Sequence, residues 1–142
     1  MPYVDSSQLP DLPLAFMNRD HAEEFRLLEE LGQALEAHGQ GSGTTDEILQ
    51  RLAVLAVKTR EHFLHEESVM REAAFPAYLP HKMEHDRVLA EMDAEAKAFR
   101  ERGDTKRLRR YLIDSVPRWF VAHTTSMDVV TAGFVAARRT PR

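Results

Sequence analysis

The stretch TTDEILQRLAVLAVKTREHFLHEESVM, residues 44–70, decides the fold class. Thr44 and Glu47 have the spacing of a capping box, in which side chains satisfy the free backbone N–H groups at the start of a helix. Beyond them one set of residues recurs at three- and four-residue intervals. The set comprises Ile48, Leu52, Leu55, Thr59, His62, Glu66 and Met70. This stripe predicts a long amphipathic helix that reaches about Ala74.

The same periodicity predicts three more helices with short connections. One starts at Asn18, an N-cap residue type, and continues to His38, where glycines follow. Another follows the proline-marked segment FPAYLP and ends before Gly103. The last begins at residue 104 or 105, and we expect an interruption at Pro117. Four such helices predict an all-α protein, an antiparallel up-down-up-down four-helix bundle.

We expect the bundle to span residues 16–128 and both ends of the chain to lie outside it. Residues 1–15 contain three prolines, which resist helix formation, and should form an extended arm. Residues 129–142 should form a short helix and tail, with Val130, Phe134 and Ala137 on its apolar face.

Composition narrows the chemistry. The 142 residues include no cysteine, which excludes disulfides, thiolate nucleophiles and iron-sulfur ligation. The net charge of -4 gives no reason to expect a nucleic-acid partner, and no apolar run is long enough to span a membrane. The first residues lack the basic start and apolar stretch of a signal peptide, so we expect a cytoplasmic protein.

Histidines extend the core stripe of every predicted helix. His21 lies 17 residues before His38, and His62 lies 18 residues after Thr44. His85 and His123 stand at matching distances from the turn that follows the third helix. Antiparallel neighbours place equal distances side by side, so these histidines should meet at one level, about 25 Å from the turns.

Local spacings add further ligand candidates. HFLHE sets His62 and Glu66 four residues apart, and HKMEH does the same for His81 and His85. WFVAHTTSMD separates His123 from Asp128 by five residues, a spacing that a regular helix does not place on one face. We therefore expect the helix to unwind, widen or end within TTSM.

A metal site explains this set better than a structural polar cluster, whose desolvation would be costly. The predicted ligands are His21, His62, Glu66, His81, His85, His123 and Asp128. His38 and His65 are interpreted as surface or capping groups.

The ordered pattern of a first-helix histidine, HxxxE, HxxxH and HxxxxD resembles the hemerythrin family, the HHE cation-binding domain proteins. The words HF..EE..M and WF..H....D match as well, and the resemblance spans about residues 16–128. It implies two iron ions, Fe2+ or Fe3+, bridged by Glu66, Asp128 and an oxo or hydroxo group. His81, His85 and His123 would hold one iron, and His21 with His62 the other.

The implied function is reversible O2 binding, for storage, delivery or scavenging. The ligand count leaves one coordination position open, on the iron with two histidines. By family position Trp119 and Phe120 should line the O2 pocket, and Phe63 is a further candidate; the family commonly has leucine where Phe120 stands. The alternatives are an oxygen or iron sensor that acts through an unidentified protein partner, and a di-iron enzyme acting on peroxide or nitric oxide. The sequence offers no second substrate pocket, which favours a binding protein over an enzyme.

Overall fold

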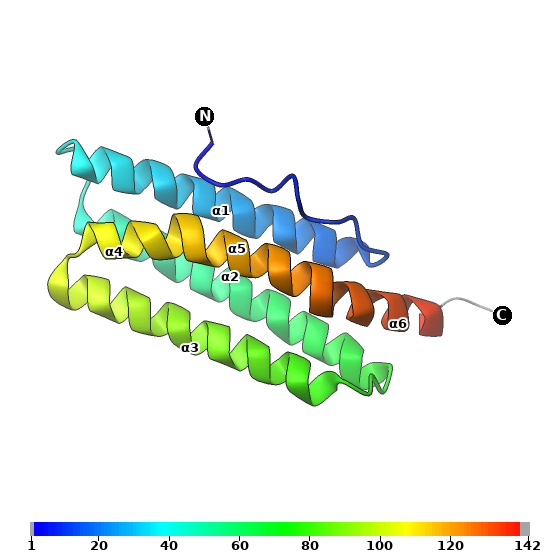
Figure 1. The fold of residues 1–142 in the computed structure, drawn as a ribbon. Helices are drawn as coiled ribbons and strands as arrows, with labels where there is room; N and C mark the ends of the chain where they lie inside the picture. The colour runs from blue at the N-terminus through cyan, green and yellow to red at the C-terminus, as the bar shows by residue number, and fades with distance from the viewer. Residues whose placement is uncertain (1, 140–142) are drawn as a thin grey trace.

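The computed structural model describes residues 2–139, which form a bundle of long antiparallel helices (Figure 1). The helices are α1 (Ala15–Gly39), α2 (Thr45–Glu72), α3 (Tyr78–Arg102), α4 (Thr105–Arg109), η1 (Arg110–Ser115), α5 (Val116–His123), η2 (Thr124–Asp128) and α6 (Val129–Arg139), where η marks a π-helical turn. The segments from α4 to α6 follow one another directly and make up the fourth helix. No strand occurs within residues 2–139, so the predicted all-α four-helix bundle is confirmed.

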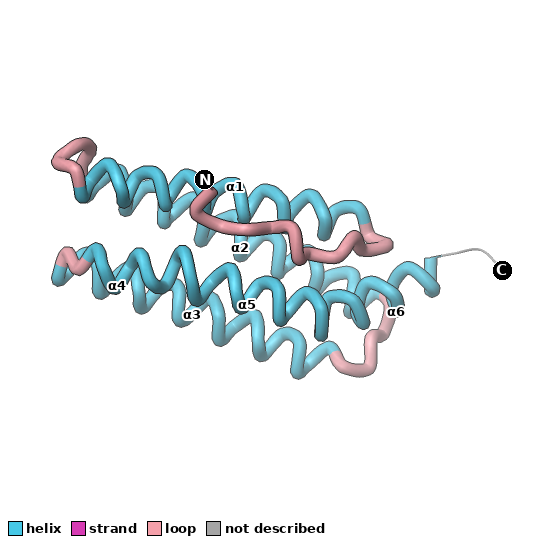
Figure 2. The backbone as a smooth tube through the Cα atoms, turned by 45° about the horizontal axis from the view of Figure 1, so that its top comes forward, coloured by secondary structure: helices cyan, strands magenta, loops and turns pink. Residues whose placement is uncertain are grey.

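The connections alternate between the two ends of the bundle. Figure 2 shows the turns after α1 and after α3 at one end and the α2–α3 connection at the other. The Thr44 side chain accepts a hydrogen bond from the Glu47 backbone N–H at 3.1 Å, as the capping box predicts. Asp104 caps α4 through the Arg107 N–H, and Gly103 ends α3 with a left-handed φ of 63°.

The first helix begins at Ala15, so the predicted start at Asn18 was wrong. The Asn18 side chain binds the preceding arm instead of a helix N-terminus. Its Oδ1 accepts from the Leu12 N–H and its Nδ2 donates to the Leu12 carbonyl, both at 2.9 Å. Asn18 therefore fastens the arm to α1.

The N-terminal arm lies along the bundle (Figure 1). The Tyr3 N–H donates to the Glu29 carboxylate at 2.6 Å, and Val4 binds the same group at 3.2 Å. A Cβ at Gly32 would come within 2.6 Å of the Tyr3 ring, so this position of α1 needs glycine for the arm to pack closely.

The fourth helix is irregular at two places. The interruption expected at Pro117 takes the form of η1, the π-helical turn just before it. This turn includes Ile113, whose carbonyl would face the proline ring in a regular helix. The second irregularity, η2, lies in TTSMD, and it takes the form of a widened turn, one of the three outcomes expected there beside unwinding and termination.

The apolar face predicted for the C-terminal helix was wrong by one residue. Val130 is 58% exposed, whereas Thr131, Ala132 and Val135 are buried. The π-helical turn in η2 takes up one extra residue, so every inward position after it shifts along the chain by one. Residues 140–142 of the predicted tail lie outside the described part of the chain.

The interior has three layers along the bundle axis. An apolar core fills the end near the α1–α2 turn, and its largest contributors include Phe25, Leu28, Leu31, Leu55, Leu112 and Phe120. A second apolar cluster closes the opposite end, with Leu14, Phe16, Met17, Val69, Ala132 and Val135 among its members. Buried histidines and carboxylates separate the two. None of the helices in residues 2–139 combines the length and apolar character needed to cross a membrane.

Candidate metal centre

The structure brings all seven predicted ligands together in the polar layer, and none is more than 4% exposed. They are His21 of α1, His62 and Glu66 of α2, His81 and His85 of α3, His123 of α5 and Asp128 at the end of η2. Every helix of the bundle contributes, and the histidines lie at one level as their equal distances from the turns predicted.

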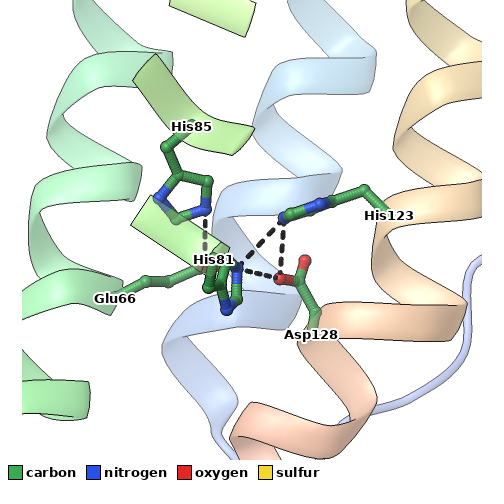
Figure 3. A group of neighbouring side chains, drawn as sticks. All are labelled: Glu66, His81, His85, His123 and Asp128. Carbon is green, nitrogen blue, oxygen red and sulfur yellow. Dashed lines mark hydrogen bonds and ion pairs between the residues drawn. The ribbon is translucent and has the colours of Figure 1, made fainter. Parts of the chain in front are cut away.

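The first group contains three histidines. One nitrogen or oxygen atom from each of Glu66, His81, His85, His123 and Asp128 lies within 4.8 Å of all the others (Figure 3). The Nε2 atoms of His81 and His123 are 3.1 Å apart, and each lies 3.1 Å from Asp128 Oδ1. Glu66 Oε1 is 3.2 Å from His85 Nε2.

The second group contains two histidines and lies beside the first. It comprises His21, His62 and Glu66, again with their ligand atoms within 4.8 Å. Glu66 Oε2 contacts His62 Nε2, and Asp128 Oδ2 lies 3.1 Å from His21 Nε2. Each of the two carboxylates thus directs one oxygen to the three-histidine group and the other to the two-histidine group.

The widened turn explains how Asp128 reaches this position. In η2 the chain makes about one turn over the five residues that separate it from His123. Ser126 Oγ donates to the Ala122 carbonyl at 2.6 Å, and Thr125 Oγ1 donates to the Val121 carbonyl at 2.8 Å. These hydrogen bonds tie the side chains of the widened turn to the last turn of α5.

Three of the imidazoles are oriented by hydrogen bonds on the side away from the cluster. The Nδ1–H of His62 donates to Glu24 at 2.8 Å, and that of His85 donates to Glu67 at 2.9 Å. The Nδ1 of His81 pairs with Thr131 Oγ1 at 2.8 Å. With Nδ1 occupied outside, each ring turns its Nε2 lone pair inward, the arrangement found in metal-binding histidines.

Several inward atoms are close to one another yet make no hydrogen bond. Among the seven predicted ligands, the buried atoms without a hydrogen bond are His21 Nδ1 and Nε2, Glu66 Oε1, His85 Nε2 and Asp128 Oδ1. Buried polar atoms without partners destabilise a fold unless something else binds them. Five imidazoles and two carboxylates suit a divalent transition metal, so the residues fit a metal site.

The carboxylates carry their charge despite burial. Burial alone would raise the pKa of Glu66, but the imidazoles of His62, His81 and His85 hold it well below its ordinary value. Burial likewise opposes ionisation of Asp128, and its histidine neighbours lower that pKa too. Burial would lower the pKa of His81, but Asp128 and Glu66 outweigh it and raise the pKa to about 9. Protons and metal ions compete for the same lone pairs, so metal binding should release protons.

Aromatic rings cover the cluster on the side of the apolar core. Phe63 stacks on His85 with ring centroids 3.8 Å apart, and Trp119 stacks on His123 at 4.5 Å. Phe120 lies edge-on to His21 at 6.2 Å and is 1% exposed. All three predicted wall residues therefore touch or face cluster imidazoles.

Sequence reasoning missed the outward partners Glu24, Glu67 and Thr131. A signal was present, because Glu24 stands three residues after His21 and Thr131 three residues after Asp128, so each continues an inward face. The other histidines behave as interpreted. His65 is exposed and stacks on Phe16 at 3.8 Å, and His38 lies 3.4 Å from Thr45 Oγ1.

Known proteins share both the sequence pattern and the fold. Residues 12–131 match the family model described as "Hemerythrin HHE cation binding domain". Two proteins named bacteriohemerythrin are each 30% identical to the chain. The Aquifex aeolicus protein aligns over 82% of this chain and 86% of its own, and the Ralstonia nicotianae protein over 97% and 93%.

Solved structures agree at the level of the fold. A crystal structure of a hemerythrin point mutant has a TM-score of 0.76 and 21% identity, and covers 96% of this chain and 99% of its own. Wild-type hemerythrin has a TM-score of 0.73 and 21% identity, with coverages of 93% and 95%. With the family model spanning nearly the whole bundle and two bacteriohemerythrins 30% identical over most of the chain, the chain belongs to the hemerythrin family.

Proposed function

We propose that the cluster holds two iron ions and that the protein binds O2 reversibly. The observation that carries the proposal is the placement of Glu66 and Asp128, each with one oxygen toward either histidine group. A carboxylate in that position can bridge two cations. The likeness to proteins named bacteriohemerythrin supports iron as the metal.

The two histidine groups would give the two metal ions different roles. His81, His85 and His123 would supply three nitrogens to one ion, and His21 and His62 would supply two to the other. An ion held by two histidines and the two carboxylates would have fewer protein ligands than its neighbour and could accept a small ligand. When bound, a reduced di-iron pair supplies two electrons to O2 and recovers them when O2 leaves.

The chain's own residues would make this exchange reversible. Glu24, Glu67 and Thr131 fix three imidazole rings, so the metal-binding histidines need not reorganise when O2 enters. Phe63 and Phe120, each 1% exposed, keep water from the cluster. A dry, preorganised site limits both solvent reorganisation and loss of the bound ligand by side reactions.

The test is to load the protein with Fe2+ without oxygen, admit O2 and then remove it while recording the visible spectrum. We expect two iron ions per chain and a charge-transfer band that grows with O2 and fades on its removal. His62→Ala and His81→Ala should each reduce iron affinity on the order of 100-fold or more, because each removes a direct ligand. Irreversible oxidation on the first exposure would contradict reversible binding and favour a sensor or an enzyme.

A further inference from the structure

A polar pocket between α1 and α2 reaches the two-histidine group from the surface. It has a volume of about 220 Å³, and His62 is one of its lining residues. His62 is 2% exposed, so the pocket ends where the buried cluster begins. The proposed function gives this pocket no role.

The rim of the pocket is acidic. Asp20 and Glu23 come from α1 and Glu61 from α2. The cations beside them are Lys58, which also lines the pocket, and Arg26, whose Nε donates to Glu23 at 2.9 Å. Lys58 Nζ lies 3.9 Å from Glu61 Oε2, and both side chains are at least half exposed, so solvent weakens this pair. The rim therefore retains an excess of negative charge that attracts cations.

The floor of the pocket is Glu24, whose side chain is 1% exposed. One of its oxygens accepts the hydrogen bond from His62 Nδ1 at 2.8 Å. The other, Oε2, is buried and makes no hydrogen bond within the described residues. A buried carboxylate oxygen without a partner is costly, and a cation that passes through the pocket would bind it.

Another pocket that reaches the cluster differs in character. It has a volume of about 200 Å³, meets the cluster at His81 and is lined by Phe75, Pro80, Met127 and Val130 among others, with no carboxylate. The acidic pocket also offers no finished metal site, because the close groups of three or more ligands found in residues 2–139 are those of the cluster. Its geometry suits transit of a cation rather than storage.

We propose that this acidic pocket is the route by which a divalent metal ion reaches the cluster, with Asp20 and Glu61 attracting the ion and Glu24 receiving it beside His62. The inference rests on the proposed metal centre and adds how that centre is filled. The side chain of Glu24 then has two tasks, since one oxygen orients a ligand imidazole and the other meets the incoming ion.

The experiment measures the rate at which metal-free protein takes up Co2+, followed by its visible absorption in a stopped-flow instrument, with metal per chain determined at the end. Glu24→Gln should slow uptake about tenfold while final metal content is retained. Glu67→Gln is the matched control, because Glu67 supports His85 as Glu24 supports His62 but does not line the pocket. Loss of the orienting carboxylate can slow loading in both variants, so the route predicts that Glu24→Gln loads several-fold more slowly than Glu67→Gln.

A second pair of variants tests the rim and does not alter any hydrogen bond to the cluster. Asp20→Asn with Glu61→Gln should slow uptake several-fold at low ionic strength, and the difference should shrink with added salt. Asp93→Asn with Glu101→Gln changes the net charge equally at exposed positions of α3 and should have a smaller effect.

The outcomes separate the route from the metal centre itself. Loading that is slower in Glu24→Gln than in Glu67→Gln, and slower in the rim variant than in the α3 variant, supports the route. Equal rates in all variants, or equal slowing by Glu24→Gln and Glu67→Gln, would overturn it and leave the metal centre intact. A wild-type protein that ends without metal would overturn the route and the proposed function together.

Discussion

The apolar core and the polar layer are formed by the same continuous stripes of the same four helices, yet burial has opposite effects on stability in the two regions. Leu28, Leu31 and Leu55 of the core are fully buried, and burial of such side chains stabilises the fold directly. In the polar layer His21, Glu66 and Asp128 are just as buried, and each has an atom without a hydrogen-bond partner. The comparison shows that helix periodicity places a residue inside but does not determine whether burial stabilises the protein.

The largest effect should come from breaking the register that joins Asp128 to the polar layer. Insertion of one alanine after Thr125 turns every later residue by about 100° relative to α5. We expect loss of metal binding, measured as metal per chain, and weaker packing of α6, because η2 already absorbs one extra residue. One glycine inserted after Gly41, in the exposed turn beside the apolar core, should leave metal content unchanged.

The opposite change refines this prediction. Deletion of Ser126 leaves His123 and the aspartate four residues apart, a spacing that a regular α-helix places on one face. Metal binding should therefore survive the deletion. Loss of metal in both the insertion and the deletion would mean that the π-helical geometry itself, and not only the direction of Asp128, is required.

Metal removal should have the next largest effect on the stability of the protein, and it changes only the interactions made within the polar layer. A ligand present at 1,000 times its dissociation constant stabilises the folded state by about 4 kcal/mol, which for a domain of this size is about 10 °C in Tm. Thermal unfolding followed by circular dichroism, with and without a chelator, measures the difference. An unchanged Tm would contradict a metal centre in the layer.

A cavity in the apolar core should cost a similar free energy by another route. Leu31→Ala should lower the free energy of unfolding in urea by about 3 kcal/mol, because Leu31 is fully buried. Metal per chain should stay at the wild-type value, which distinguishes this variant from changes in the polar layer. A loss of metal on Leu31→Ala would show that the two layers are coupled.

The fold and the seven cluster residues could be predicted because helix periodicity and turn signals act locally. The capping box at Thr44 and the glycine at 103 have the same geometry in any context. The start of α1 could not be predicted in this way, since Asn18 pairs with Leu12 of an arm whose path depends on tertiary packing. The inward face of α6 was missed by one residue because its register depends on the kind of irregularity in η2.

The outward partners were missed for a different reason. The spacing of Glu24 from His21 places it on the inward face of α1, but the spacing does not show that it meets His62 of α2. Glu67 of α2 likewise meets His85 only because α3 packs against it. The spacing of ligands within one helix can be read from the sequence. A hydrogen bond between two helices depends on how each helix is rotated about its axis, and the spacing of residues does not give that rotation.

The smallest effect is expected where the two layers meet, at Trp119, which packs on the apolar core and stacks on His123. Its indole N–H donates to Glu84 Oε1 at 2.8 Å. Glu84→Gln keeps an oxygen that can accept from the indole N–H but removes the charge, and it should lower the free energy of unfolding by about 1 kcal/mol because hydrogen bonds to charged groups are the stronger ones. Fluorescence of Trp119, the one tryptophan in the chain, measures both unfolding and the change in its surroundings.

The pH dependence gives this last prediction its sign. Hydrogen bonds from Arg87 lower the pKa of Glu84, and the Trp119 N–H lowers it further. Partial burial opposes both, and the resulting pKa is about 2. A carboxyl with a depressed pKa stabilises the fold above its unfolded value of about 4.5 and loses that contribution as the pH falls toward 2. The difference in the free energy of unfolding between wild type and Glu84→Gln should therefore be constant near neutral pH and shrink as the pH falls below 4.5.

Glu91→Gln is the control for this prediction. It removes another carboxylate bound to Arg87, at 3.0 Å, without touching Trp119, so the Trp119 fluorescence of this variant should match wild type. If both variants altered the Trp119 emission equally, the charge on Arg87 and not the indole hydrogen bond would define the boundary between the layers.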